Sequence, residues 1–139
     1  MKKKVLFICI HNSARSQMAE ELLRKMAGDK FEVESAGIEP GTINPYVARV
    51  LKEDEGIDIS NKKTNAVFDF FKEGRLYAYV IAVCDQASAE KCPIFPGVSQ
   101  KIQWSFSDPS GFEGSDEEKL AKVREVKKEI EDKLTEWLS

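Results

Sequence analysis

The sequence predicts an α/β protein built on one doubly wound parallel sheet of four strands, in the order 2-1-3-4, with helices on both faces. Short apolar runs alternate with helical patterns, and each of the two most apolar runs ends in a cysteine. Strands that alternate with helices form parallel sheets, and right-handed crossovers leave few possible strand orders. Because 139 residues with 42% hydrophobic content show no repeat or linker, we expect one domain over residues 1–139.

The first half of the chain contains two expected strands and two expected helices. Residues 5–8 are apolar, with β-branched and aromatic side chains, as in a buried strand. In the helical pattern that follows, the residues expected to face the core recur at steps of four: Ala14, Met18, Leu22 and Met26. Residues 31–36 alternate like a second strand. Asn44 is expected to cap a second helix that starts at Pro45 and ends at Gly56.

The second half contributes two more strands and the last helix. Residues 66–72 are expected to form a short helix with these side chains inward: Val67, Phe70 and Phe71. The apolar residues 76–83 are expected to form a central strand that ends at Cys84, and residues 101–106 the fourth strand. Residues 115–118 form a capping box. The inner stripe of the helix that it opens should be Leu120, Val123, Lys127, Ile130, Leu134 and Trp137.

The loop of residues 9–16, between the first strand and the first helix, suggests an oxyanion site. A tight turn into a helix N-terminus leaves backbone N–H groups pointing at one spot. Arg15 adds a planar fork of donors that suits a tetrahedral oxyanion. Cys9 would be held there as a thiolate, with Ser16 as a donor to its sulfur and Asn12 bracing the loop. The alternative is a cysteine that is inert packing at a strand end.

Residues 9–16, Cys-Ile-His-Asn-Ser-Ala-Arg-Ser, resemble the phosphate-loop signature of low-molecular-weight protein tyrosine phosphatases. Residues 17–20, Gln-Met-Ala-Glu, look more like the arsenate reductases of the same fold, and the resemblance extends from Lys4 to the final helix. It implies that the substrate oxyanion is bound by Ile10, His11, Asn12, Ser13, Ala14, Arg15 and Ser16. The imidazole of His11 either tunes this pocket or faces solvent.

Asp108 follows the fourth expected strand and precedes Pro109, which places it at the same edge of the sheet as the loop. A residue before proline is biased to an extended conformation, so its side chain is aimed outward. A carboxylic acid above the loop could protonate the departing oxygen, whereas the alternative is an ordinary Asp-Pro turn. The resemblance implies that Asp108 is the general acid found in both families.

Cys84 and Cys92 bound a segment beside the expected nucleophile, because strands 1 and 3 meet where the chain reverses direction in the sheet. A structural zinc site needs four ligands, and the one histidine, His11, lies inside the anion loop. Buried cysteines can also be inert. Residues 92–97 resemble the resolving segment of the arsenate reductases. This implies a relay in which Cys9, Cys84 and Cys92 react in turn, and thioredoxin, or glutaredoxin with glutathione, reduces the last disulfide.

Two positions depart from the patterns of these families. The phosphatases usually carry a tyrosine after Asp-Pro, where this chain has Ser110, which weakens the phosphatase interpretation. Some reductases bind an alkali cation with residues matching Asn12, Glu20, Ser35 and an acid where Asn65 stands here. The amide weakens the expectation of that alkali cation site. We expect the chemistry to require no metal and no organic cofactor.

Charge and hydropathy limit the partners. The net charge of −3 and the pI ≈ 5.3 argue against nucleic acid. No apolar run approaches the roughly 20 residues that span a membrane, and the polar loop interrupts the signal-like start of the chain. We therefore expect a cytoplasmic arsenate reductase whose partners are arsenate and a thiol donor. The alternatives are a protein tyrosine phosphatase with redox-protective cysteines and a non-catalytic oxyanion-binding module.

Overall fold

The structure, a computed structural model, describes residues 2–84, 90–91, 95, 97 and 99–139. Within these residues, four strands form one parallel sheet: β1 (Lys3–Cys9), β2 (Phe31–Gly37), β3 (Tyr79–Ala82) and β4 (Gln100–Gln103). Their order is β2-β1-β3-β4, so the chain reverses between β1 and β3. The predicted fold class and strand order are confirmed.

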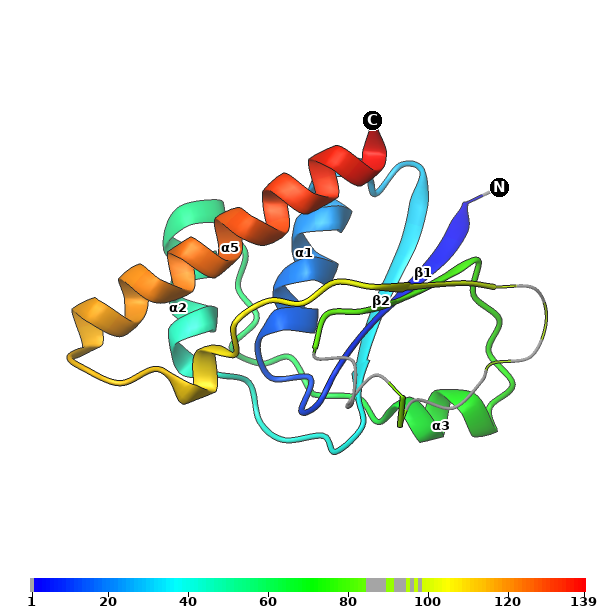
Figure 1. Cartoon of the computed structure of the whole chain (residues 1–139), viewed down its shortest axis with the longest axis horizontal. Helices are drawn as coiled ribbons and strands as arrows, with labels where there is room; N and C mark the ends of the chain where they lie inside the picture. Colours follow the sequence, from blue (N-terminus) through cyan, green and yellow to red (C-terminus); the bar gives the residue numbers. More distant parts are fainter. Residues whose placement is uncertain (1, 85–89, 92–94, 96, 98) are drawn as a thin grey trace.

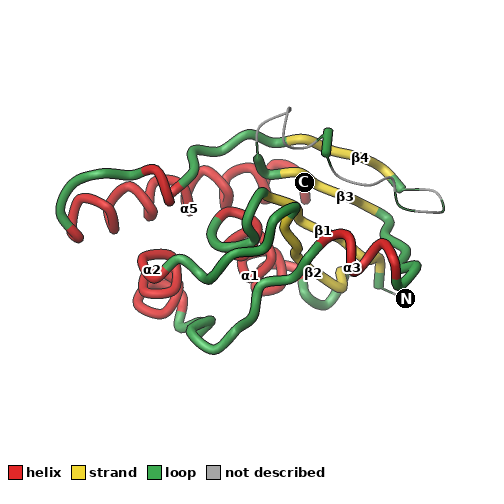
Figure 2. Tube along the Cα trace, turned by 90° about the horizontal axis from the view of Figure 1, so that it is seen from below, coloured by secondary structure: helices red, strands yellow, loops and turns green. Residues whose placement is uncertain are grey.

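Helices cover both faces of this sheet (Figures 1 and 2). One side carries α1 (Arg15–Ala27), α2 (Pro45–Glu55) and α5 (Asp116–Leu138), and the other side carries the short α3 (Val67–Lys72). Alternate side chains of β1 enter the two cores: Phe7 packs with the larger set of helices, and Ile8 with α3. Because β1 is buried on both faces, its sequence is a continuous apolar run.

The expected caps of α2 and α5 are present. The Asn44 side chain accepts bonds from the N–H groups of Tyr46 (2.9 Å) and Val47 (3.3 Å), and Gly56 ends α2 with a φ of 69°. At α5, the Ser115 hydroxyl accepts the N–H of Glu118 at 3.2 Å, as the capping box requires. These two helices therefore begin where the sequence predicts.

Both later strands are shorter than predicted. β3 starts at Tyr79 rather than at residue 76, because the pairing with β1 begins with the bond from the Ala78 N–H to the Lys4 carbonyl. Leu76 lies before that point and is 57% exposed. β4 ends at Gln103, so residues 104–106 belong to the loop that follows.

Two predictions of inward side chains are wrong. Met26 is 41% exposed. In a helix of 3.6 residues per turn, each step of four residues goes about 40° beyond a full turn, so Met26, three steps after Ala14, lies about 120° around α1 from it. Leu23 and Ala27 are buried on this part of α1 instead. Phe71 is 40% exposed at the margin of α3, where its ring meets the edge of another aromatic ring. None of the described helices is both long enough and apolar enough to cross a membrane.

Candidate active site

The ends of β1 and β3 bring Cys9 and Cys84 to the same edge of the sheet. Ile8 pairs with Ala82, and the Val83 N–H donates to the Ile8 carbonyl at 2.8 Å. Cys9 therefore lies level with Val83, and Cys84 follows directly. Both cysteines are buried in the same apolar cluster, with exposures of 2% and 0%. The structure thus brings together the first two members of the predicted relay.

The sulfur of Cys9 faces two polar groups. The hydroxyl of Ser16 lies 2.8 Å from Sγ, and the backbone N–H of Asn12 donates to Sγ at 3.1 Å. An N–H group can only donate, so the sulfur accepts this bond. Sulfur accepts best as the thiolate, which is the nucleophilic form of cysteine.

The amide of Asn12 has a defined orientation. Its Oδ1 accepts bonds from Gln17 Nε2 at 3.0 Å and from the Asn65 N–H at 2.9 Å. The Nδ2 group therefore points the other way. Asn12 itself has a φ of 54°, in the left-handed region that asparagine tolerates better than most residues.

This orientation fixes the direction of the hydrogen bonds beyond Asn12. Its Nδ2 donates to the hydroxyls of Ser16 (2.8 Å) and Ser35 (2.9 Å). Because the Ser16 oxygen accepts from Asn12, the hydrogen of that hydroxyl is available for the sulfur of Cys9. Ser16 is thus placed to donate a second hydrogen bond to the sulfur of Cys9.

The start of α1 supplies donors for an anion above Cys9. Ala14, the N-cap, makes no side-chain capping bond, so α1 begins without a side-chain acceptor for its first N–H groups. Arg15 is 5% exposed; its Nη1 donates to the Phe106 carbonyl at 3.3 Å, while its Nε is buried and bonds to no protein acceptor. Buried donors without partners are rare in folded proteins. A bound oxyanion would satisfy this one.

Asp108 lies beside this arginine. Its Oδ2 is 3.5 Å from Arg15 Nη2, and its side chain is 39% exposed. The backbone carbonyl of Asp108 accepts the N–H of Gly111 as the short 3₁₀ helix η1 (Pro109–Gly111) begins. The carboxyl group is thus at the mouth of the loop, where the sequence places a general acid.

The other loop residues have different surroundings. The side chain of His11 is exposed, and its Nδ1 bonds to the Glu39 carbonyl at 2.8 Å. Ile10 packs against the large core, and Ala14 is buried. The Ser13 carbonyl accepts the Asn44 N–H at 2.9 Å. These residues can therefore offer a bound oxyanion their backbone N–H groups more readily than their side chains.

Gly37 is a site residue that the sequence reasoning missed. A Cβ there would lie 2.7 Å from the Asn12 nitrogen, so only glycine lets the loop pack this closely on the end of β2. A glycine that ends a strand often marks such a close approach. Gln17 orients Asn12 through a side-chain bond. The sequence gives no sign of this role, because Gln17 enters only through the family resemblance.

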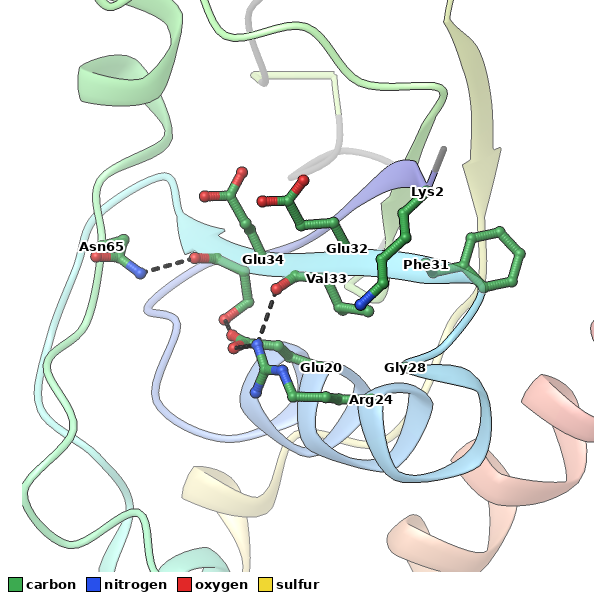
Figure 3. Close-up of a pocket in the computed structure, with 10 residues that line it drawn as sticks. Lys2, Glu20, Arg24, Gly28, Phe31, Glu32, Val33, Glu34 and Asn65 are labelled. Atoms are coloured by element: carbon green, nitrogen blue, oxygen red, sulfur yellow. Dashed lines mark hydrogen bonds and ion pairs between the residues drawn. The ribbon is translucent and has the colours of Figure 1, made fainter.

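The hydrogen bonds continue from Asn12 in the loop to Ser35 on β2, and from there to Glu20 and Asn65. Figure 3 shows the part around Glu20 and Asn65. Ser35 donates to Glu20 Oε1 at 2.5 Å, and Asn65 Nδ2 donates to the Ser35 carbonyl at 3.0 Å. Glu20, Arg24 and Asn65 line a pocket there. In the described ranges, no group of three or more His, Cys, Asp or Glu is arranged to hold a metal ion. The third predicted relay residue, Cys92, lies outside the described residues.

Comparisons with known proteins agree with this geometry. The family model of the low molecular weight phosphotyrosine protein phosphatases matches residues 4–139. Arsenate reductases from Halalkalibacterium halodurans and Bacillus subtilis are 41% and 39% identical, over 93% and 99% of this chain and 90% and 96% of their own lengths. A thioredoxin-dependent arsenate reductase from Corynebacterium glutamicum has a similar structure, with a TM-score of 0.65 and 30% identity over 96% of this chain and 62% of that one. The chain belongs, with these arsenate reductases, to the low-molecular-weight phosphotyrosine protein phosphatase family.

Proposed function

We propose that this chain is a cytoplasmic arsenate reductase that works by a relay of three cysteines. The observation that carries the proposal is a second buried thiol, Cys84, at the end of the strand next to the Cys9 loop. A phosphatase needs only one cysteine, because water releases the product from its intermediate. The names of the relatives support arsenate as the substrate.

In the first step, arsenate occupies the loop and the Cys9 thiolate attacks arsenic. The group that leaves is a hydroxide, which Asp108 protonates so that it departs as water. Arg15 and the N–H groups at the start of α1 bind the charged oxygens. The product of this step is an arsenic(V) adduct bonded to the Cys9 sulfur.

In the second step, the Cys84 thiolate attacks the Cys9 sulfur. A disulfide forms, the sulfur–arsenic bond breaks, and its electron pair stays on arsenic, which leaves as arsenite. Neighbouring strands lie about 4.8 Å apart and each residue advances about 3.3 Å, so α-carbons one residue out of level lie roughly 6 Å apart, within the roughly 7 Å that a disulfide tolerates. The ends of β1 and β3 are therefore compatible with this bond.

In the third step, Cys92 attacks Cys84, which releases the Cys9 thiolate and forms a Cys84–Cys92 disulfide. A thiol donor, thioredoxin or glutaredoxin with glutathione, then reduces that disulfide. The sum is arsenate plus a dithiol giving arsenite, water and a disulfide. No metal or organic cofactor enters these steps.

The decisive experiment is an arsenate reduction assay in which each donor is supplied separately. We expect arsenite to form repeatedly with one donor system, and no more than about one arsenite per enzyme molecule when no thiol donor is supplied. Turnover of phosphotyrosine without arsenite formation would instead support a tyrosine phosphatase. Binding of arsenate with neither reaction would support a non-catalytic oxyanion-binding module.

The role of Cys92 can be tested by single turnover. The Cys92→Ser variant, treated with one equivalent of arsenate and mapped under non-reducing conditions, should accumulate a Cys9–Cys84 disulfide. The wild type should accumulate Cys84–Cys92. Full multiple-turnover activity of Cys92→Ser would show that the donor reduces the Cys9–Cys84 bond directly.

A further inference from the structure

Glu20 is a buried carboxylate behind the Cys9 loop, with an exposure of 4%. Its Oε1 accepts the bond from Ser35, while its Oε2 lies 2.5 Å from Arg24 Nη2 and 2.8 Å from Lys62 Nζ. A buried charge is tolerated only where it is paired and hydrogen-bonded. Both oxygens of Glu20 meet this requirement with groups of the protein itself.

The ion cluster around Glu20 is electrically balanced. Glu21 Oε1 lies 2.9 Å from Arg24 Nη1 and 2.9 Å from Lys62 Nζ, so two carboxylates share two cations. Burial alone would raise the pKa of Glu21, but the bonds and charges of Lys62 and Arg24 outweigh it and lower that pKa. An additional cation at this place would leave the cluster with an excess positive charge.

The residues that match the alkali cation site of some relatives do not fit a cation here. Alkali cations, like other hard cations, bind oxygen atoms. Asn12 instead turns its Nδ2 group onto the hydroxyl of Ser35. Asn65 turns its Nδ2 group onto the carbonyl oxygen of Ser35 (Figure 3). The hydroxyl hydrogen of Ser35 is directed at Glu20. The two oxygens of Ser35 and Oε1 of Glu20, which a cation would need as ligands, therefore already accept hydrogen bonds from the protein.

We propose that Lys62 is a positioning residue that acts as the built-in counter-ion of Glu20, so that the Cys9 loop needs no alkali cation. Ser35 and Asn12 connect Glu20 to the loop through hydrogen bonds of 2.5 and 2.9 Å. The inference rests on the proposed function in one respect, since it takes Cys9 as the nucleophile.

Lys62 neutralises the charge of Glu20, and its position in the chain also lets it fix the Cys9 loop. Lys62 lies three residues before Asn65, whose N–H donates to Asn12 Oδ1. The segment that carries both residues is thus attached to α1 at Glu20 and to the Cys9 loop at Asn12. Arg24 belongs to α1 itself, so its bond to Glu20 cannot attach a second segment.

The test is the rate at which iodoacetamide alkylates Cys9 at fixed neutral pH, followed by peptide mapping. The wild type is measured in KCl, NaCl and choline chloride at equal ionic strength. We expect the same rate in all three salts. A rate that increases specifically with K⁺ would overturn the proposal, and this comparison needs no variant.

Variants at position 62 give the second part of the test. Lys62→Ala should slow Cys9 alkylation roughly three- to tenfold, because residues of a coupled network modulate one another to this extent; at about 1.4 kcal/mol per factor of ten, the change is about 0.6–1.4 kcal/mol. Lys62→Arg should retain most of the rate. The matched control, Lys63→Ala, removes a neighbouring exposed lysine and should change nothing.

An unchanged rate in Lys62→Ala would contradict the positioning role. Alkylation requires only the Cys9 thiol, so it reports on Lys62 even if the arsenate assay fails. If wild-type Cys9 reacts no faster than an ordinary thiol, the nucleophile of the proposed function is wrong. The two failures are therefore distinguishable.

Discussion

Cys9 and Cys84 end neighbouring strands and are both buried, yet their surroundings differ. The sulfur of Cys9 faces the Ser16 hydroxyl and the Asn12 N–H at the start of α1. Both cysteines lie in the same apolar cluster, and the backbone carbonyl of Cys84 accepts a bond from Gln103 Nε2 at 2.7 Å, which ties the chain after β3 to the end of β4. Attack on an oxyanion needs donors arranged in advance around the nucleophile, whereas attack on a sulfur needs mainly closeness and alignment. Replacing Cys9 and replacing Cys84 should therefore have different effects on arsenate reduction and on aryl phosphate hydrolysis.

The largest effect is expected for Cys9→Ser. A serine hydroxyl is a far weaker nucleophile in this loop, so both arsenate reduction and hydrolysis of small aryl phosphates should fall by about 10³-fold or more. Both rates are measured by steady-state kinetics. An aryl phosphatase rate close to that of the wild type would remove Cys9 from the chemistry and end the comparison.

Replacing the second thiol should affect one reaction only. Cys84→Ser should lose multiple-turnover arsenate reduction, while hydrolysis of aryl phosphates stays within about threefold of the wild type, because the first step needs only the Cys9 loop and the acid. Thermal unfolding of the variant serves as the control for folding. Loss of both activities in a folded variant would mean that Cys84 is not a separate relay residue.

Asp108→Asn tests the acid that serves both reactions. The amide keeps the size of the side chain but cannot donate an acidic proton, so we expect a loss of about 10²-fold. The loss in aryl phosphate hydrolysis should be greatest for substrates with poor leaving groups, since these depend most on protonation. An equal loss for good and poor leaving groups would show that Asp108 acts through its contact with Arg15 rather than as an acid.

The parts of the fold that were predictable depend on local chemistry. Residues close in sequence specify three of these features: the apolar run of β1, which is buried on both faces, the cap at Asn44 and the capping box at Ser115. The same holds for the loop from Cys9 to Arg15, in which the proposed nucleophile and the proposed donors are close in sequence. The predictions for Met26 and Phe71 are wrong for different reasons: a repeated step of four moves Met26 about 120° around α1, whereas Phe71 lies at the margin of the inner face of α3.

The parts of the site that were not predictable depend on distant pairs. The orientation of Asn12 is set by Asn65, 53 residues away, and the partner of Glu20 on the far side of the network is Lys62. Neither pairing leaves a periodic signal in the sequence. The sequence shows that Asn65 stands where some reductases have an acid. That Lys62 is the counter-ion of Glu20 can be seen only in the structure.

The smallest effect is expected at Glu55. Its replacement should change the stability of the fold without changing the chemistry, so it is a reference for the variants of the two thiols. Glu55 on α2 bonds to Lys127 on α5 at 2.8 Å and to Lys25 on α1 at 2.9 Å. These bonds outweigh burial and lower the pKa of Glu55. A carboxyl group with a lowered pKa stabilises the fold above its unfolded value of about 4.3, and this contribution is lost as the pH falls through the folded value.

Glu55→Gln should therefore lower the free energy of unfolding by about 0.5–1 kcal/mol at pH 7, since Lys25 is half exposed although Lys127 is buried. The difference from the wild type should begin to shrink as the pH falls below about 4.3, and it disappears as the pH passes through the lowered folded pKa of Glu55, where the wild-type carboxyl also becomes neutral. Urea unfolding at pH 7 and pH 3.5 measures this, and Glu129→Gln, on the exposed side of α5, is the control. Arsenate reduction and aryl phosphate hydrolysis at pH 7 should be unchanged in Glu55→Gln. If either activity fell, a loss of stability alone would impair the site, and the losses expected for Cys84→Ser and Asp108→Asn could no longer be assigned to chemistry.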